Sequence, residues 1–521
     1  MKIFLEGMTK GLKALVIDFG GQYVHLIARR CRELGVYSEI VDPEEIFKKL
    51  DEGGVGAIIL SGGPRSVLDP ASPKIDLMKL VSYDIPILGI CYGHQLIAKT
   101  LGGEIKAGRI REYGKTFVEI LEKDTLLEGL PNRITVWMNH GDTVVKPPRG
   151  FKATSMSEDG AITSMTDGSK IYSTQFHPEV THAQYGKKIL ERFLRKICGI
   201  DAWWNPRDRI KELIEEIRSK VAVDEKVICA ISGGVDSVTT ATIVSKAVGD
   251  RLYCIFVDHG LMRKDEVEQV KNSLRRIGIR NLNIVDAHER FLSKLKGVKD
   301  PEEKRRIIGE EFIKIFEEEA RKISGIRWLA QGTIYPDRVE SGRTGRKVAL
   351  IKSHHNVGAL PKRMNLKLIE PLRDFYKDEV REIARKLGTP EEIVSRHPFP
   401  GPGLAVRIIG EITEEKLKIC REANAIVEEE FKKAGLYDKV WQAFAVICND
   451  RWVGVMGDER VLGYIVIIRV VESVDGMTAD WHKIDHNLLE RISNRITRRI
   501  PKVTMVAYAA TSKPPSTIEP C

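Results

Sequence analysis

Residues 226–238, KVICAISGGVDSV, decide the fold of the chain. An apolar run that ends at Ile231 passes through Ser232-Gly233-Gly234-Val235-Asp236-Ser237 into a helical stretch expected to begin near Val238. This order is typical of a buried strand, a tight turn and a helix. The N–H groups of such a turn point toward one anion at the start of the helix. The stretch therefore predicts a phosphate-binding loop in an α/β domain.

The loop differs from a Walker A loop, which would end in Gly-Lys-Ser/Thr. Transfer of a γ-phosphate is therefore the weaker interpretation of this loop. Asp236 would repel a bare phosphate, but it suits a nucleotide that Mg²⁺ bridges to the carboxylate. The alternative is a tight Gly-Gly turn that binds nothing, and the strand before it and the helix after it argue against that alternative.

A second turn of the same kind carries a thiol. GICYG at residues 89–93 lies between an apolar run and a helix expected at residues 94–101, so Cys91 is placed at a helix N-terminus that favours its thiolate. His177 and Glu179 follow another predicted strand and offer a base and a carboxylate that can fix its tautomer. Taken alone, Cys91 could be a buried structural cysteine. The whole set predicts a cysteine nucleophile.

An oxyanion hole has two candidate donors. Gly63, in the Ser-Gly-Gly-Pro turn at residues 61–64, follows a predicted strand end, and Tyr92 follows the thiol directly. Their backbone N–H groups could point at one oxygen. His25, His94 and His182 are interpreted as local hydrogen-bonding residues.

Length and composition set the limits for the function. The 521 residues suit three to four domains, and 83 Lys and Arg against 73 Asp and Glu give a net charge of +10. This charge favours anionic partners or reflects a surface rich in salt bridges, and both remain open. The eight cysteines form no C-x-x-C pair, so neither a disulfide framework nor a zinc site is expected. No signal peptide or membrane span is apparent, and a cytoplasmic protein without a membrane partner is expected.

Three domains are expected along the chain. Apolar runs alternate with amphipathic stretches over residues 12–200 and again over 206–400, which predicts two doubly wound domains of the α/β class with mostly parallel sheets. A linker at residues 201–206, Asp-Ala-Trp-Trp-Asn-Pro, separates them. The proline- and glycine-rich stretch 396–403 marks the next boundary, and residues 401–521 predict a smaller α+β domain.

These motifs resemble two known families. Residues 12–200 are similar to class I glutamine amidotransferases, which implies that Cys91 attacks glutamine, His177 moves the proton and Glu179 orients the imidazole. Asn139 stands where that family usually has Ser. The glycine loop resembles that of N-type ATP pyrophosphatases, which implies Mg²⁺ at Asp236 and ATP as a co-substrate. The resemblance implies the following ATP-binding residues: Ser232, Gly233, Gly234, Val235, Asp236, Ser237, Val257 and Gly332.

Longer motifs narrow the resemblance to one family. Residues 352–357, 370–374, 396–404 and 513–519 together resemble the glutamine-hydrolysing GMP synthetase family. This implies a homodimer formed through residues 401–521 and a site for xanthosine monophosphate (XMP). The resemblance implies that residues 396–404 and 513–519 help bind XMP, and the individual residues implied for XMP are Arg306, Asp458, Lys513 and Glu519. The sequence departs from the family at Ala509-Ala510, where Asp-Ile is usual, and at Pro520-Cys521, where Trp-Glu is usual, so XMP affinity is the property most affected.

The resulting hypothesis is a ligase of purine biosynthesis that forms a C–N bond. Glutamine hydrolysis supplies ammonia for the ATP-dependent amination of XMP to GMP, and AMP and pyrophosphate are released. No tightly bound organic cofactor is expected. The alternatives are an amidotransferase-linked ligase with another acceptor and an inactive nucleotide-sensing protein. A nucleic-acid partner is not expected, because the chain lacks a platform of aromatic and basic residues.

Overall fold

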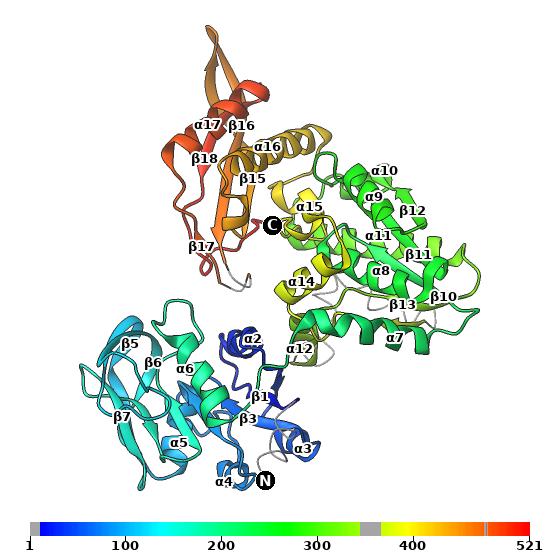
Figure 1. The fold of residues 1–521 in the computed structure, drawn as a ribbon. Coiled ribbons are helices and arrows are strands. Elements are labelled where there is room, and N and C mark those ends of the chain that lie inside the picture. Colours follow the sequence, from blue (N-terminus) through cyan, green and yellow to red (C-terminus); the bar gives the residue numbers. More distant parts are fainter. Residues whose placement is uncertain (1–10, 344–365, 474–475, 477) are drawn as a thin grey trace. The chain divides into compact units, whose positions relative to one another are not determined.

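The computed structural model describes residues 11–343, 366–473, 476 and 478–521. The chain divides into two compact units, Met1–Asn205 and Pro206–Cys521, and each is described by itself (Figure 1). The motif at residues 352–357 lies outside the described residues. None of the helices within the described ranges is long and apolar enough to cross a membrane.

Unit 1 contains a nine-stranded sheet in its described part, in the order β2-β1-β3-β4-β9-β8-β7-β5-β6. Neighbours from β2 to β9 pair in parallel, and those from β9 to β6 pair antiparallel. The strands are β1 Lys13–Ile17, β2 Ser38–Val41, β3 Val55–Leu60, β4 Ile87–Ile90, β5 Glu104–Ile120, β6 Arg133–Lys146, β7 Lys152–Ser157, β8 Ile162–Thr166 and β9 Ile171–Thr174. The parallel strands are apolar because both faces are covered: all six residues of β3 are buried.

The helices of unit 1 are α2 Val24–Glu33, α3 Ile46–Asp51, α4 Leu77–Val81, α5 Tyr92–Thr100 and α6 Gly186–Arg192, and a π-helical turn follows at Phe193–Ile197. Helix α5 begins two residues earlier than the sequence predicted. Strand β4 therefore ends at Ile90 and α5 starts at Tyr92, which leaves Cys91 alone at the junction.

Unit 2 begins with a parallel sheet in the order β12-β11-β10-β13-β14. Its strands are β10 Lys226–Ile231, β11 Leu252–Asp258, β12 Asn281–Asp286, β13 Ile326–Ala330 and β14 Lys367–Ile369. The helices are α7 Ile210–Lys220, α8 Val235–Val248, α9 Glu266–Arg276, α10 His288–Leu295, α11 Pro301–Arg321, α12 Tyr335–Arg343, α14 Lys377–Leu387 and α15 Glu391–Val394. Helix α8 begins three residues earlier than predicted, so Val235, Asp236 and Ser237 form its first turn.

The remainder of unit 2 is an antiparallel sheet with two helices. Strands β15 Gln442–Met456, β16 Glu459–Glu472 and β17 Asp480–Trp481 pair antiparallel, and β18 Val503–Tyr508 pairs with β16 in parallel. Helices α16 Glu414–Lys433 and α17 His486–Arg499 lie beside this sheet (Figure 1). Mixed α/β units with parallel-rich sheets and a smaller C-terminal sheet confirm the predicted fold class.

One hydrophobic cluster joins the two sheets of unit 2. It contains Ile228 and Leu329 from the parallel sheet, Ile447 and Val503 from the C-terminal sheet, and Leu404 between them. The predicted boundary near residue 400 therefore crosses a continuous core, and the separation of a dimerisation domain there stays a prediction.

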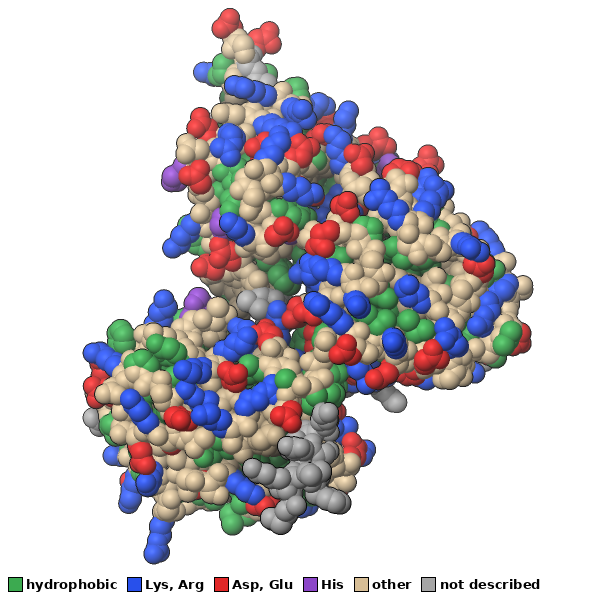
Figure 2. Space-filling model, in the orientation of Figure 1, with side chains coloured by type: hydrophobic (Ala, Val, Ile, Leu, Met, Phe, Trp, Pro, Cys, Tyr) green, Lys and Arg blue, Asp and Glu red, His purple; other side chains and the backbone are tan. Residues whose placement is uncertain are grey.

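The drawn surface carries both signs of charge. Lys and Arg side chains are interspersed with Asp and Glu over the face shown in Figure 2. Many of them form ion pairs, such as Arg306–Glu310 at 2.8 Å and Lys196–Glu128 at 2.6 Å. This distribution favours the salt-bridge interpretation of the basic composition.

Candidate active sites

Cys91 occupies a strained turn between β4 and α5. Its backbone φ is +54°, a left-handed value that side chains other than glycine rarely adopt. The turn is held by a hydrogen bond from the N–H of Cys91 to the carbonyl of Thr174 at 2.8 Å. Gly93 is required next to it, because a Cβ there would lie 2.5 Å from the carbonyl oxygen of Leu60. Such stored strain is typical of a nucleophile elbow.

His177 and Glu179 form a buried pair. Nδ1 of His177 lies 2.6 Å from Oε1 of Glu179, and the Glu179 side chain is 0% exposed. Burial lowers the pKa of His177, but the charges of Glu179 and Cys91 outweigh burial and raise this pKa from 6.5 to about 10. Nε2 of His177 is buried and has no hydrogen-bond partner among the described residues. That nitrogen is therefore available to exchange a proton with the thiol.

Gly62 shows how closely the thiol and the imidazole approach. A Cβ on Gly62 would lie 3.0 Å from Cε1 of His177 and 3.9 Å from Sγ of Cys91. The neighbouring residue Gly63 lies against Tyr92, because a Cβ on Gly63 would come 3.2 Å from the Cγ atom of Tyr92. The structure thus brings together all five residues that the sequence singled out for this site.

The glycine loop of unit 2 is closed by its own side chains. Oγ of Ser237 accepts a hydrogen bond from the N–H of Ser232 at 3.2 Å and donates one to the carbonyl of Gly234 at 3.1 Å. Gly233 has a φ of +80°, and a Cβ there would lie 2.6 Å from a methyl carbon of Val270. Gly332 lies behind the loop, because its Cβ would be 3.1 Å from the backbone carbon of Asp236. Glycine is therefore needed at both positions.

Asp236 is suited to a magnesium ion. Its Oδ1 is buried and makes no hydrogen bond among the described residues, while Oδ2 lies 3.4 Å from Nζ of Lys377. A carboxylate oxygen left without a partner at an anion-binding loop fits Mg²⁺, which uses one or two protein carboxylates together with phosphate oxygens and water.

A cavity of about 1010 Å³ opens beside this loop. Its lining includes all the ATP-binding residues that the resemblance implied, together with Lys513 and Glu519. Arg306 is not placed there: it pairs with Glu303 and Glu310 on the exposed side of α11, and its neighbour Arg305 lines the cavity instead. Adjacent helical residues point about 100° apart, which explains the difference. Asp458 is exposed at the tip of the β15–β16 hairpin and does not line the cavity either.

The tail is anchored to the core next to the cavity. Glu519 lies 3.3 Å from Nη2 of Arg407, whose Nη1 donates to Asn424 at 2.9 Å. Gln442 also donates to Glu519, at 3.1 Å. Burial lowers the pKa of Arg407, and its guanidinium carbon lies 5.1 Å from the ring centre of Phe399 in the proline-rich segment. Lys513, residues 517–521 and residues 396–402 all line the same cavity.

Comparison with known proteins matches the chain to three family models. They are glutamine amidotransferase class-I over residues 15–197, NAD synthase over 207–306 and GMP synthase C terminal domain over 429–520. The GMP synthase (glutamine-hydrolyzing) of Pyrobaculum aerophilum is 56% identical over 98% of this chain and 100% of its own length. The chain belongs to the glutamine-hydrolysing GMP synthase family.

Two further members of the GMP synthase family show the same full-length similarity. The proteins of Carboxydothermus hydrogenoformans and Thermotoga maritima are 53% and 52% identical, each over 97% of this chain and 99% of their own length. The resemblance inferred from the sequence motifs is thereby confirmed.

Several residues that contact the two candidate sites were not predicted from the sequence. Arg30 donates to the carbonyl of Glu179 at 3.0 Å, and the ring of Tyr23 meets the His177 ring edge-on at 4.9 Å. Both belong to α2 or its N-terminal cap, about 150 residues before the triad loop. Lys377 and Arg305 in unit 2 were missed for the same reason: no local motif identifies a partner that is distant in the sequence.

Proposed function

We infer that the chain makes GMP from XMP, using ammonia released from glutamine and ATP that is cleaved to AMP and pyrophosphate. The observation that carries this is the presence in one chain of a buried Cys–His–Glu set and a glycine loop facing a nucleotide-sized cavity. Membership of the glutamine-hydrolysing GMP synthase family supplies the reaction that uses both.

We propose that Cys91 is the nucleophile of glutamine hydrolysis. Its thiolate attacks the side-chain amide carbon of glutamine, and the N–H groups of Gly63 and Tyr92 stabilise the oxyanion. His177 donates a proton to the departing ammonia and then takes one from the water that hydrolyses the thioester to glutamate. Glu179 stabilises the imidazolium, in agreement with the raised pKa of His177.

We propose that the glycine loop, residues 232–237, binds the phosphates of ATP. The O2 oxygen of the xanthine base attacks the α-phosphorus and pyrophosphate leaves, after which ammonia attacks the adjacent carbon and AMP leaves. The N–H groups at the start of α8 hold the anionic oxygens, and Val257 and Gly332 also line the cavity. Bound at Asp236, Mg²⁺ would offset the charge of the leaving pyrophosphate.

The XMP site is proposed in the same cavity, at the residues of its lining that come from α11 and the C-terminal tail. Lys513 and Arg305 offer cationic donors for the nucleotide phosphate, and Glu519 offers a carboxylate already held by Arg407. Lys513 now donates to the carbonyl of Gly476 at 2.8 Å, so it must exchange that contact on binding.

A homodimer is proposed from the exposed hairpin of β15 and β16, and the cytoplasm is proposed as its location. Val453, Val455 and Leu462 lie on one face of this hairpin and are 60–71% exposed, and Val453 and Leu462 are direct cross-strand partners, whereas Trp452 points to the other face. A contiguous apolar surface of this kind suits a second copy of the chain. Sedimentation equilibrium measures the state directly.

The variant Cys91→Ala tests the two-site scheme. It should lose glutamine-dependent pyrophosphate release and keep the release supported by added ammonia, because the glycine loop belongs to the other unit. Release by the wild type must depend on XMP. Loss of both activities, with an unchanged thermal midpoint, would contradict the two-site scheme.

A further inference from the structure

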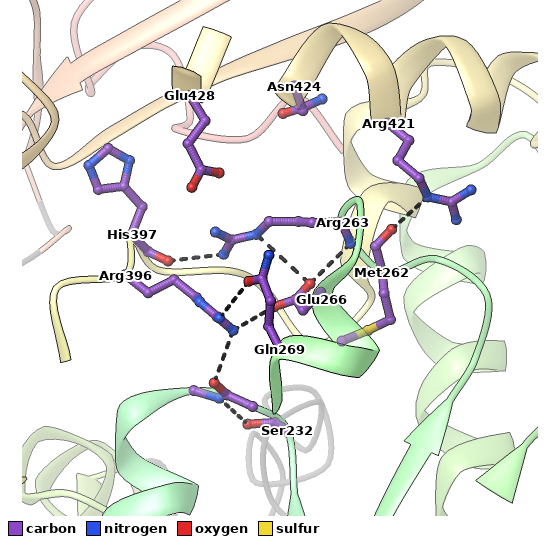
Figure 3. A network of polar contacts seen from close by, with 12 residues as sticks. Ser232, Met262, Arg263, Glu266, Gln269, Arg396, His397, Arg421, Asn424 and Glu428 are labelled. Carbon is purple, nitrogen blue, oxygen red and sulfur yellow. Dashed lines mark hydrogen bonds and ion pairs between the residues drawn. The ribbon is translucent and has the colours of Figure 1, made fainter. Parts of the chain in front are cut away.

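Arg396 connects the proline-rich segment to the glycine loop. Nη1 of Arg396 lies 3.4 Å from the carbonyl oxygen of Gly233 and 3.2 Å from Oε1 of Glu266, and Nη2 donates to Oε1 of Gln269 at 3.1 Å. Figure 3 shows the guanidinium between the loop at Ser232 and the first turns of α9. The side chains of Arg396 and Glu266 are 10% and 3% exposed. The guanidinium of Arg396 thus connects the proline-rich segment with the glycine loop and with α9.

The residues next to Arg396 in this network are also fixed by their own contacts. Nη2 of Arg263 donates to the carbonyl of His397 at 3.0 Å, and the His397 ring stacks on Tyr437 with centres 3.8 Å apart. The backbone N–H of Arg263 donates to Oε2 of Glu266 at 3.0 Å. Glu266 therefore receives Arg396 on one oxygen and the Arg263 backbone on the other, as Figure 3 displays. The position of the Arg396 guanidinium is determined from both sides.

The direction of the Gly233 carbonyl fixes the direction of the N–H group of Gly234. In a trans peptide the C=O of Gly233 and the N–H of Gly234 point in opposite directions. This peptide lies between two glycines, whose backbones accept many conformations, so it could rotate about ψ of Gly233 and φ of Gly234 and turn an oxygen toward the anion. A cation that holds the carbonyl opposes that rotation. Phosphate binding by a loop of N–H groups depends on their direction.

We propose that Arg396 is a positioning residue for the ATP step: it holds the Gly233–Gly234 peptide in the orientation that binds polyphosphate, and Glu266 and Gln269 hold Arg396. The inference rests on the proposed role of the glycine loop in ATP binding. The proline-rich segment thus has two roles. Its first residue positions the ATP loop, and Phe399 to Pro402 line the cavity in which the acceptor is proposed to bind. A lysine cannot make the three contacts at once, since it lacks the planar fork.

The test is a double-mutant cycle on KM for ATP, measured as pyrophosphate release with saturating XMP and ammonia. Arg396→Lys keeps the charge, and Gln269→Ala removes an exposed anchor that does not line the cavity. Arg396→Lys should raise KM for ATP by roughly 10- to 100-fold, because that is the factor expected when one hydrogen bond to a charged group is lost. Gln269→Ala should raise it by a smaller factor, with little effect in the Arg396→Lys background.

The control is Glu268→Gln, at the neighbouring solvent-exposed position of the same helix, where Glu268 pairs with Lys271 at 2.9 Å. It should leave KM for ATP unchanged. XMP-dependent release by the wild type confirms the ATP step independently of the variants. Two results would overturn the positioning role: a wild-type KM for ATP in Gln269→Ala, or an equal effect of Gln269→Ala on this KM in the wild-type and Arg396→Lys backgrounds. Arg396 would then be a direct phosphate ligand.

Discussion

A methyl group added at Gly62 should slow glutamine hydrolysis without affecting ATP cleavage. The Cβ of Gly62→Ala would lie 3.0 Å from Cε1 of His177 and 3.6 Å from Cβ of Cys91. Carbon atoms pack best at about 3.5–4.0 Å, so the imidazole must retreat by about 0.5 Å. Gly62 is not among the glycines with positive φ, so its backbone accepts alanine.

The size of the effect follows from the displacement. A misplacement of about 1 Å in a reacting group can cost roughly 10²-fold in rate, so about 0.5 Å should cost roughly 10-fold in kcat for glutamine. Glutamate release from glutamine and pyrophosphate release supported by ammonia are measured on the same preparation. Only the first should fall.

Gly141→Ala is the matched control in the same unit. A Cβ at Gly141 meets no described atom within 4 Å, so this variant should hydrolyse glutamine at the wild-type rate. Wild-type glutamate release by Gly62→Ala would refute the reasoning, because the thiol and the imidazole would then react in an arrangement other than the one described. A fall in both activities together with a lower thermal midpoint would point to unfolding instead.

Two further predictions concern the ATP loop and the response to acid. Gly233→Ala should abolish measurable pyrophosphate release and spare glutamine hydrolysis, because its Cβ would clash with Val270 and its φ of +80° disfavours alanine; wild-type KM for ATP would contradict this. Burial lowers the pKa of His94 to about 3, so its contribution to stability is present above pH 6.5 and is lost as the pH falls toward 3, by about 2 kcal/mol at pH 5. His94→Gln should therefore lose less unfolding free energy than the wild type between pH 7 and 5, and equal losses would exclude His94 as a source.

The sequence predicted those parts of the sites that are contiguous. Cys91 and the loop 232–237 lie on strand-turn-helix segments, and glycine, polar and apolar residues in that order allow few other structures. The start of α8 was placed three residues too late, because Val235 and Ser237 form the first helical turn while they also close the loop. Helix termini are the least determined part of any periodic pattern.

The contacts that the sequence did not reveal join distant segments. Arg396 reaches the carbonyl of Gly233 over 163 residues, and Arg30 reaches that of Glu179 over 149. Both acceptors are backbone oxygens, which leave no trace in the identity of a side chain. Strand β15 was missed because the ladder shifts register between Ile447 and Arg451, where polar residues interrupt the apolar run.

The departures from the family pattern at residues 520 and 521 can be judged from the way the tail is held. Arg407 is buried, and a buried guanidinium requires acceptors. It has them in Glu519 and Asn424, and Gln442 adds a second hydrogen bond to Glu519. The anchored carboxylate thus comes before Pro520. Cys521 adds a contact of its Sγ with the carbonyl of Ile408 at 3.7 Å, and its backbone oxygen accepts a hydrogen bond from Arg305. The carboxylate that pairs with Arg407 belongs to Glu519, which precedes the altered residues. The change from Trp-Glu to Pro-Cys therefore alters the cavity wall and leaves intact the contacts of Glu519 that hold the tail against it.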